Sequence, residues 1–339
     1  MIVDGKNLAD WQGEELIFLI CQPRSGSTLL QRMLGEHADI LVLPEPWVML
    51  HPLYARRREG IETEYDHSLA LMALDDYLRR IDTDGDALFD EAVKAWAWCH
   101  YRAALADSGK TLFLDKTPRY YFIAEDLQRL FPRARFIYLL RNPLAVLRSL
   151  LNTWIQGNWV VFSNFHHDLV TAPGKLLAAA ARGESRRCLL HYESLVAEPE
   201  ATLKRLCDEL ALEFQPGMLR YRGSEKLAGG FGDPVTVDAH DRPVGDYAEQ
   251  WRDLAGDPQR RHIAHAYLDA LGDPLLQQLG YDPEALRAAL GKPPRIRGDI
   301  IPWERLIDPG FTGIQPKRSK LRLAWRVLRG RPLPQQDGC

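Results

Sequence analysis

The chain has 339 residues, of which 46% are hydrophobic and 26% charged, and its net charge at pH 7 is −3. This composition is ordinary for a globular protein, and the length allows one large domain or two. The small net charge gives no indication of a nucleic-acid partner, and no apolar run reaches the roughly 18 residues of a membrane-spanning helix.

The chain carries five cysteines, and none of them is close to another in the sequence. This odd number and wide spacing fit neither a zinc site nor a disulfide framework, and three of the five are expected as buried thiols in apolar runs. The first residues also lack the basic and apolar regions of a signal peptide. These features predict a cytoplasmic protein without a metal site.

The first strong signal for structure and function lies near the N-terminus. Residues 17–21 form an apolar run typical of a buried strand, and a helical pattern of apolar residues follows the polar loop after it. Backbone N–H groups converge at such a helix start, and the helix dipole favours negative charge there. We therefore predict a site for a phosphate-like group, built from Arg24, Ser25, Gly26, Ser27 and Thr28.

This loop differs from the phosphate-binding loop of nucleoside triphosphatases. Their loop requires a glycine, four further residues and then Gly-Lys-Ser or Gly-Lys-Thr. Here no glycine opens the loop and no lysine follows Gly26. A cation precedes the glycine instead, because Arg24 supplies a permanent planar charge, while Gly26 permits close approach of the backbone.

Further apolar runs have the length and composition of buried strands. They lie at residues 112–114, 136–140 and 188–191, with a further candidate at 40–43. Helical segments separate them, which predicts βαβ units and an α/β fold with a mostly parallel central sheet flanked by helices. Ligands bind such sheets at the carboxyl ends of the strands.

The run at 136–140 leads directly into a second basic position. Arg141 follows it, with Asn142 as a candidate N-cap and Pro143 as a candidate first helical residue. Ser149 lies about two turns along the helix that follows. Arg141 thus lies at the carboxyl end of a strand, and the first loop lies at the carboxyl end of another, so both anion sites are expected at the same edge of the sheet. Considered alone, Arg141 and Ser149 also fit a surface arginine and an ordinary helix serine.

Together these residues resemble the sulfotransferases that use 3′-phosphoadenosine 5′-phosphosulfate (PAPS), over roughly residues 14 to 255. The resemblance is to the branch that includes protein-tyrosine sulfotransferases and bacterial enzymes acting on small molecules or carrier-bound acyl chains. It implies a P-loop-like fold in which the first loop holds the 5′-phosphosulfate. An Arg…Ser pair eight residues apart, here Arg141 and Ser149, holds the 3′-phosphate. The family's Tyr-Glu-x-Leu motif also matches, at residues 192–195.

The resemblance also implies catalytic residues. Lys116, which follows the predicted strand at 112–114, matches a lysine that the tyrosine-sulfating branch places near the bridging oxygen of PAPS. There it neutralises charge on the leaving group, together with Arg24. Glu45 lies at the offset from Arg24 at which this branch and the carrier-acyl branch have a catalytic glutamate. Flanking prolines stiffen its backbone, and Trp47 can desolvate its carboxylate.

Other basic side chains compete for roles in the site. Cytosolic steroid and phenol sulfotransferases use a histidine base, which leaves His51 as a rival to Glu45. His37 falls on the apolar face of the helix after the first loop and is expected in the core. Arg242 follows a glycine-rich stretch and fits the position from which a late loop of the family closes over the 3′-phosphate.

We expect a sulfotransferase domain over residues 1–290 and a Pro/Arg-rich extension over 291–339. Within the domain, two aromatic-rich segments, 46–110 and 152–185, are too long for plain crossovers and are expected to form helical caps on the acceptor side. The extension has seven cations and no acid between residues 317 and 331, which leaves the rest of the chain acidic.

Apolar residues in this basic segment follow a helical spacing, at Leu321, Trp325 and Leu328. The pattern predicts a basic amphipathic helix. Three partners fit it: the acidic body of the protein itself, an anionic membrane surface to which the protein is then peripheral, or an acidic protein such as an acyl carrier protein.

The sequence therefore predicts a PAPS-dependent sulfotransferase that transfers a sulfuryl group in line to a hydroxyl acceptor, leaving 3′,5′-adenosine bisphosphate (PAP). Glu45 is the expected general base, and no metal is required. The acceptor classes left open are a small molecule, a lipid, a sugar, a peptide and a carrier-bound acyl chain.

Two other functions are weighed against this one. A P-loop kinase or nucleotide phosphotransferase needs a metal-binding acid and a phosphate lysine, and neither can be placed in the sequence. A PAP-binding protein without activity is the other alternative, and the presence of Arg24, Glu45 and Lys116 argues against it.

Overall fold

Five parallel strands form the centre of the computed structural model, which describes residues 2–3, 6–7, 10–82, 84–183, 185–221, 242–296 and 300–311. The order of the strands in the sheet is β4-β5-β3-β6-β7. Their bounds are β3 (Leu16–Cys21), β4 (Ile40–Val42), β5 (Leu112–Lys116), β6 (Arg135–Leu140) and β7 (Arg186–His191). The predicted runs are confirmed as strands, and so is the parallel α/β sheet. Near the N-terminus, β1 (Ile2–Val3) and β2 (Lys6–Asn7) pair antiparallel.

One strand is longer than predicted. The sequence placed Lys116 after a strand that ends at residue 114, but β5 continues to Lys116, because its ladder with β3 extends to the pair Leu19 and Lys116. The strand therefore delivers this lysine directly to the carboxyl edge of the sheet.

Both faces of the sheet are buried, which explains why its strands are continuous apolar runs. In β3, Leu16, Phe18 and Ile20 belong to one core cluster. Ile17, Leu19 and Cys21, which point the other way, belong to a second cluster.

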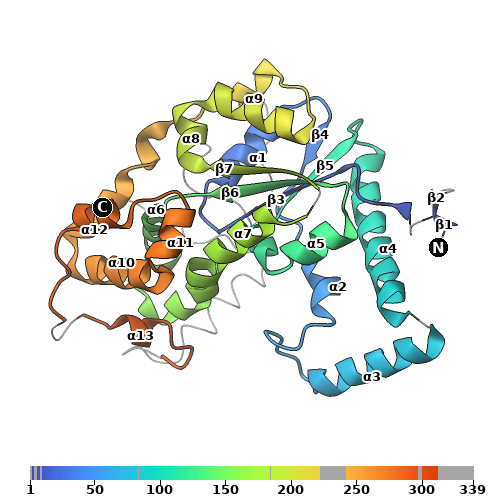
Figure 1. The fold of residues 1–339 in the computed structure, drawn as a ribbon, viewed down its shortest axis with the longest axis horizontal. Helices are drawn as coiled ribbons and strands as arrows, with labels where there is room; N and C mark the ends of the chain where they lie inside the picture. The colour runs from blue at the N-terminus through green and yellow to red at the C-terminus, as the bar shows by residue number, and fades with distance from the viewer. Residues whose placement is uncertain are drawn as a thin grey trace, which may run out of the picture.

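Helices pack on each face of this sheet (Figure 1). One face is covered by α1 (Ser27–Gly35), α8 (Tyr192–Ala197) and α9 (Pro199–Leu210). The other face is covered by α4 (Gly85–Ala106), α5 (Ala124–Leu130) and α7 (Ala172–Ala181). Since the crossover helices lie on both faces, the carboxyl edge of the sheet is left for the loops that carry the predicted site.

A further helical group with its own core lies beside the sheet, on the left of Figure 1. It consists of α6 (Pro143–Leu150), α10 (Pro258–Leu271), α11 (Asp273–Gln278), α12 (Pro283–Leu290) and α13 (Trp303–Leu306). Short 3-10 segments lie at Pro118–Phe122, Trp159–Phe165, Pro216–Leu219, Gly245–Tyr247 and Gln250–Gly256. Single π-helical turns lie at Leu151–Ile155 and His167–Thr171.

The two aromatic-rich segments are largely helical. Segment 46–110 contains α2 (Leu50–Tyr54), α3 (His67–Ile81) and α4, and α3 lies at the periphery of the molecule against α4 (Figure 1). Segment 152–185 contains most of the first π-helical turn, the 3-10 segment Trp159–Phe165, the second π-helical turn and α7. Their role as caps over the acceptor, and the domain boundary at residue 290, stay predictions. The basic segment 317–331 lies outside the described residues.

Three of the cysteines, Cys21, Cys188 and Cys207, are buried thiols, as expected, and Cys99 is exposed. Burial raises the pKa of Cys21 to about 12 and that of Cys207 to about 11, so both stay protonated and unreactive at neutral pH. None of the helices in the described part of the chain combines the length and the apolar character needed to cross a membrane.

Candidate active site

The candidate site lies at the carboxyl edge of the sheet, around the point where the chain connections diverge. The chain leaves β3 toward β4 on one side of the sheet and leaves β6 toward β7 on the other. Ligands of open α/β sheets bind at such a switch point. The structure brings to this edge the loop after β3, the segment after β4, the end of β5 and the residues that follow β6.

The loop after β3 has an unusual backbone. Arg24 has a φ of 70° and Gly26 has a φ of 87°. A Cβ atom on Gly26 would lie 2.3 Å from the ring of Tyr192, so both the backbone angle and the close approach require glycine. Gly26 is the N-cap of α1 and has no side chain to cap the helix, and the Ser25 hydroxyl is buried without a hydrogen-bond partner. These are donors that an anion at this helix start can satisfy.

Arg141 lies next to this loop. Its Nη1 donates to the Arg24 carbonyl oxygen at 2.9 Å, its Nη2 donates to the Tyr247 carbonyl oxygen at 3.1 Å, and its guanidinium lies 4.2 Å from the Tyr192 ring centre. Its Nε is buried without a hydrogen-bond partner. Burial lowers the pKa of Arg141, because carbonyls and a ring surround the cation where water would otherwise be. A bound anion would compensate this buried positive charge.

Ser149 contacts the loop arginine from the helix that follows Arg141. It lies on α6, whose predicted start is confirmed, since the Asn142 side chain accepts a hydrogen bond from the Leu144 N–H and Pro143 is the first helical residue. Arg24 Nε donates to Ser149 Oγ at 2.9 Å. The serine acts as acceptor in this bond, so its own hydroxyl hydrogen is available to an anion.

Glu45 and Lys116 form an ion pair with a distance of 2.6 Å between Oε1 and Nζ. The Lys116 side chain is 1% exposed and that of Glu45 is 12% exposed, so this pair is almost completely removed from water. The indole Nε1 of Trp47 donates to the other carboxylate oxygen, Oε2, at 3.1 Å. The two predicted catalytic residues, which lie far apart in the sequence, are therefore in direct contact.

The Tyr-Glu-x-Leu motif packs against the first loop and against the turn that carries Arg141. The Tyr192 ring packs against both Gly26 and Arg141. The Glu193 carboxylate accepts hydrogen bonds from the Asn142 N–H at 2.8 Å and the Tyr281 hydroxyl at 3.1 Å. The motif thus ties the segment after β7 to the turn after β6, which holds Arg141 in place.

An ion pair that the sequence analysis missed lies beside Trp47. Arg119 makes two hydrogen bonds to the Asp168 carboxylate, at 3.1 and 2.7 Å, and its guanidinium lies 6.0 Å from the Trp47 ring centre. Asp168 is buried and also accepts a hydrogen bond from the Tyr121 hydroxyl. No local pattern links Arg119 with Asp168, because only the packing of a π-helical turn against the segment after β5 brings them together.

The remaining predicted side chains lie in different surroundings. His37 is buried between the Glu213 carbonyl and the Asp39 N–H, as expected of a core histidine. His51 lies on α2 with an exposed side chain. Arg242 is exposed, and its carbonyl accepts a hydrogen bond from Tyr221. Its segment continues to Tyr247, which contacts Arg141, so Arg242 lies on a segment that borders the site.

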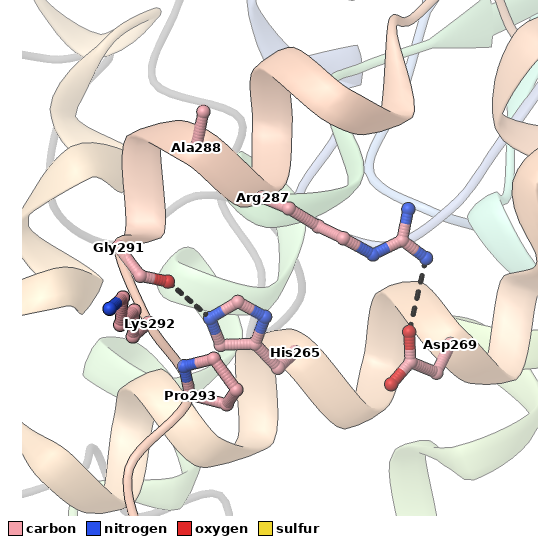
Figure 2. A pocket seen from close by; sticks show the side chains of 7 residues that line it. All are labelled: His265, Asp269, Arg287, Ala288, Gly291, Lys292 and Pro293. Atoms are coloured by element: carbon pink, nitrogen blue, oxygen red, sulfur yellow. Dashed lines mark hydrogen bonds and ion pairs between the residues drawn. The ribbon is translucent and has the colours of Figure 1, made fainter.

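A separate pocket lies between α10 and α12, and Figure 2 shows the side chains that line it. His265 contacts the Gly291 carbonyl there, and Arg287 pairs with Asp269. The pocket contains none of the predicted site residues, so it is not part of the candidate site. Among the described residues, no group of three or more His, Cys, Asp or Glu side chains is arranged to hold a metal ion.

Comparisons with known proteins point to one family. The model of the sulfotransferase family matches residues 16–216. Nodulation protein NoeE of Sinorhizobium fredii is 30% identical over 293 residues, which cover 79% of this chain and 66%, just under two thirds, of that protein. Protein-tyrosine sulfotransferase 1 of Danio rerio is 26% identical over 303 residues, covering 82% of this chain and 75% of that protein.

Among solved structures, the sulfotransferase domain from the curacin biosynthetic pathway has a similar fold. Its TM-score is 0.55 at 22% identity, and the match covers 78% of this chain and 97% of that domain. This likeness confirms the predicted P-loop-like α/β fold.

Proposed function

Because this chain belongs to the sulfotransferase family, we propose that it transfers a sulfuryl group from PAPS to a hydroxyl acceptor, with Glu45 as general base. One observation carries the proposal. The buried Lys116–Glu45 ion pair lies at the same sheet edge as a helix start with an unpaired serine hydroxyl and the buried Arg141 cation. A base next to an anion site is what transfer of a sulfuryl group from a phosphate requires.

The donor side is built from the first loop and the turn after β6. Arg24, the hydroxyl groups of the loop and the N–H groups at the start of α1 are proposed to hold the 5′-phosphosulfate. Arg141, Ser149 and Arg242 are proposed to hold the 3′-phosphate. The buried and unpaired Arg141 Nε supports this assignment, because a phosphate oxygen is a suitable acceptor for it.

On the acceptor side, Glu45 takes the hydrogen of the attacking hydroxyl while the new oxygen–sulfur bond forms. The bond between sulfur and the bridging oxygen breaks, and its electron pair stays on the 5′-phosphate of PAP. Lys116 and Arg24 stabilise that charge. The ion pair between Lys116 and Glu45 supports this assignment, because it keeps both groups at the same point of the sheet edge, where both can face the transferred SO₃. Because positioning and charge supply the catalysis, we propose that no metal takes part.

The alternatives receive less support. A kinase would use a loop lysine after the glycine, but Ser27 follows Gly26. His51 stays a rival base only if a substrate draws its exposed side chain toward the site.

We propose a hydroxyl acceptor from the classes expected above and a cytoplasmic location. The acidic carrier protein and the anionic membrane surface remain proposals for segment 317–331.

A thermal-shift assay with PAP and with ATP tests the donor. A ligand at about 100 times its Kd stabilises the native state by about 2.7 kcal/mol, so PAP is expected to raise the Tm of the wild type. Arg141→Ala should lose most of this shift. Arg186→Ala, an exposed arginine at the amino end of β7 and thus at the opposite edge of the sheet, should keep it. Stronger stabilisation by ATP than by PAP would contradict the proposed donor.

Transfer itself is tested with labelled PAPS and a panel of phenols, aliphatic alcohols, sugars, tyrosyl peptides and carrier-bound hydroxyacyl chains. Mass spectrometry should detect the addition of SO₃ to at least one class. Binding of PAP without transfer to any member of the panel would favour the inactive PAP-binding alternative.

A further inference from the structure

The residue before Lys116 in β5 is a buried carboxylate that the proposed chemistry does not use. Asp115 is 1% exposed, and its side chain points to the opposite face of the sheet from Lys116, as strand geometry requires. Three hydroxyl groups donate to it. Tyr101 and Tyr120 bond Oδ2 at 2.7 and 2.9 Å, and Thr117 bonds Oδ1 at 2.9 Å. In the part of the chain that the structure describes, no arginine or lysine forms an ion pair with it.

Two of these hydroxyl groups also accept hydrogen bonds from the segment that carries Glu45. Thr117 Oγ1 accepts from the Trp47 N–H at 3.3 Å, and the Tyr120 hydroxyl accepts from the Met49 N–H at 3.0 Å. A hydroxyl group has a single hydrogen. Because both hydrogens are donated to Asp115, the oxygen lone pairs face the backbone N–H groups of residues 47 and 49, and the carboxylate sets the direction of both bonds.

The segment held in this way is strained. Trp47 has a φ of 55°, which is rare for a bulky residue and persists only where the surroundings enforce it. Its backbone N–H is bound by Thr117, and its indole N–H is bound to Glu45. Hydrogen bonds therefore tie the Trp47 backbone to Asp115 through Thr117, and the Trp47 side chain to the Glu45 carboxylate.

We infer that Asp115 is a positioning residue that holds the Glu45-bearing segment against β5 through Thr117 and Tyr120. This inference rests on the proposed function, in which Glu45 is the base. Adjacent residues of one strand then have complementary tasks. Asp115 fixes the backbone of the segment from one face of the sheet, and Lys116 pairs with the Glu45 carboxylate on the other.

The ionised form of Asp115 is required for this arrangement. The groups around it are the hydroxyls of Tyr101 on α4 and of Tyr120 and Thr117 after β5, together with the more distant Glu45 carboxylate. Burial raises the pKa of Asp115 to about 6, and the three hydroxyl groups oppose this shift. Below that pH the carboxyl has a hydrogen of its own and cannot accept from all three hydroxyls, so at least one of these bonds must reverse or break.

Two tyrosine variants separate positioning from general packing. Tyr101→Phe and Tyr120→Phe each remove one buried hydroxyl that donates to the same oxygen of Asp115, but only Tyr120 also binds the Glu45 segment. Tyr120→Phe should lower kcat by about 10- to 100-fold with an unchanged KM for PAPS, as small misplacements of catalytic groups do. Tyr101→Phe should leave kcat within about twofold. Equal losses of kcat in both variants would overturn the inference.

Further variants test the second bond and the pH dependence. Thr117→Val should lower kcat as Tyr120→Phe does, and Thr117→Ser, which keeps the hydroxyl, should restore it. Asp115→Asn keeps the shape but cannot accept from all three hydroxyls, so it should lower kcat and remove the decline in activity that we expect of the wild type near pH 6. An unchanged acid limb in Asp115→Asn contradicts the inference.

Hydrogen exchange gives a readout that does not depend on activity. The amides of Trp47 and Met49 should exchange faster in Tyr120→Phe than in Tyr101→Phe, by about tenfold or more, because only the first variant releases this segment. If the wild type transfers no sulfuryl group but these amides respond as expected, the proposed function fails and the positioning role of Asp115 stands. Equal exchange in the two variants refutes the positioning role itself.

Discussion

Replacing Glu45 by glutamine tests the base and the buried ion pair together. Glutamine has the same shape and can still accept a hydrogen bond from Lys116, but it cannot take a proton from the acceptor at neutral pH. We expect kcat to fall by about 10²- to 10⁴-fold while the affinity for PAP stays nearly unchanged. Isothermal titration with PAP and a sulfation assay on the identified acceptor measure the two quantities separately.

The same substitution should also lower stability, for a reason that only the structure shows. Lys116 is 1% exposed and its carboxylate partner lies at 2.6 Å, so the variant leaves a buried ammonium group without its counter-charge. Removing one member of a buried pair costs about 3–5 kcal/mol, and the hydrogen bond that glutamine retains reduces this to about 2–4 kcal/mol. For a chain of 339 residues this corresponds to a fall in Tm of about 3–6 °C.

Two control variants separate the loss of the buried ion pair from the chemical change itself. Glu200→Gln makes the same chemical change in a pair of similar length, 2.7 Å to Lys204, but both side chains are more than half exposed, so it should cost less than about 1 kcal/mol and leave kcat unchanged. The double variant Glu45→Gln/Lys116→Met removes both charges and should be more stable than Glu45→Gln alone. Wild-type kcat in Glu45→Gln, with loss of activity in His51→Ala, would transfer the role of base to His51. A double variant as unstable as the sum of the single ones would refute the coupling.

Three further predictions concern the loop, the metal and the basic segment. Gly26→Ala should abolish the PAP-induced Tm shift, because its Cβ meets the Tyr192 ring. In the control Gly109→Ala, the position has a similar positive φ but open space around it, so the free energy of unfolding should fall by only about 1–2 kcal/mol. Retained PAP binding in Gly26→Ala would contradict this prediction. Sulfation should continue in excess EDTA, and activity that needs added Mg²⁺ would favour the kinase. Truncation after Pro316 should lower Tm if segment 317–331 packs on the acidic body; salt-sensitive loss of vesicle or carrier-protein binding, measured by co-sedimentation, would instead indicate an external partner.

The sequence alone determined the architecture and the family. The apolar runs, the Pro-Arg-Ser-Gly-Ser-Thr loop and the Asn142-Pro143 helix start are local patterns, and each was confirmed because short-range sterics and hydrogen bonding decide a strand, a tight loop or a cap. The rule that parallel strands place their carboxyl ends at one edge then brought Arg24 and Arg141 together, and the structure shows them in contact.

Only the tertiary structure decided which side chains meet at that edge. The contacts of Glu45 with Lys116, of Arg24 with Ser149 and of Arg119 with Asp168 join residues that lie far apart in the chain. Such pairs have no periodicity of their own, since they depend on strand order, on the length of each strand and on the angle at which helices pack. Glu45 and Lys116 lie 2.6 Å apart because β5 extends to Lys116 and because the segment with the strained Trp47 packs beside the end of that strand.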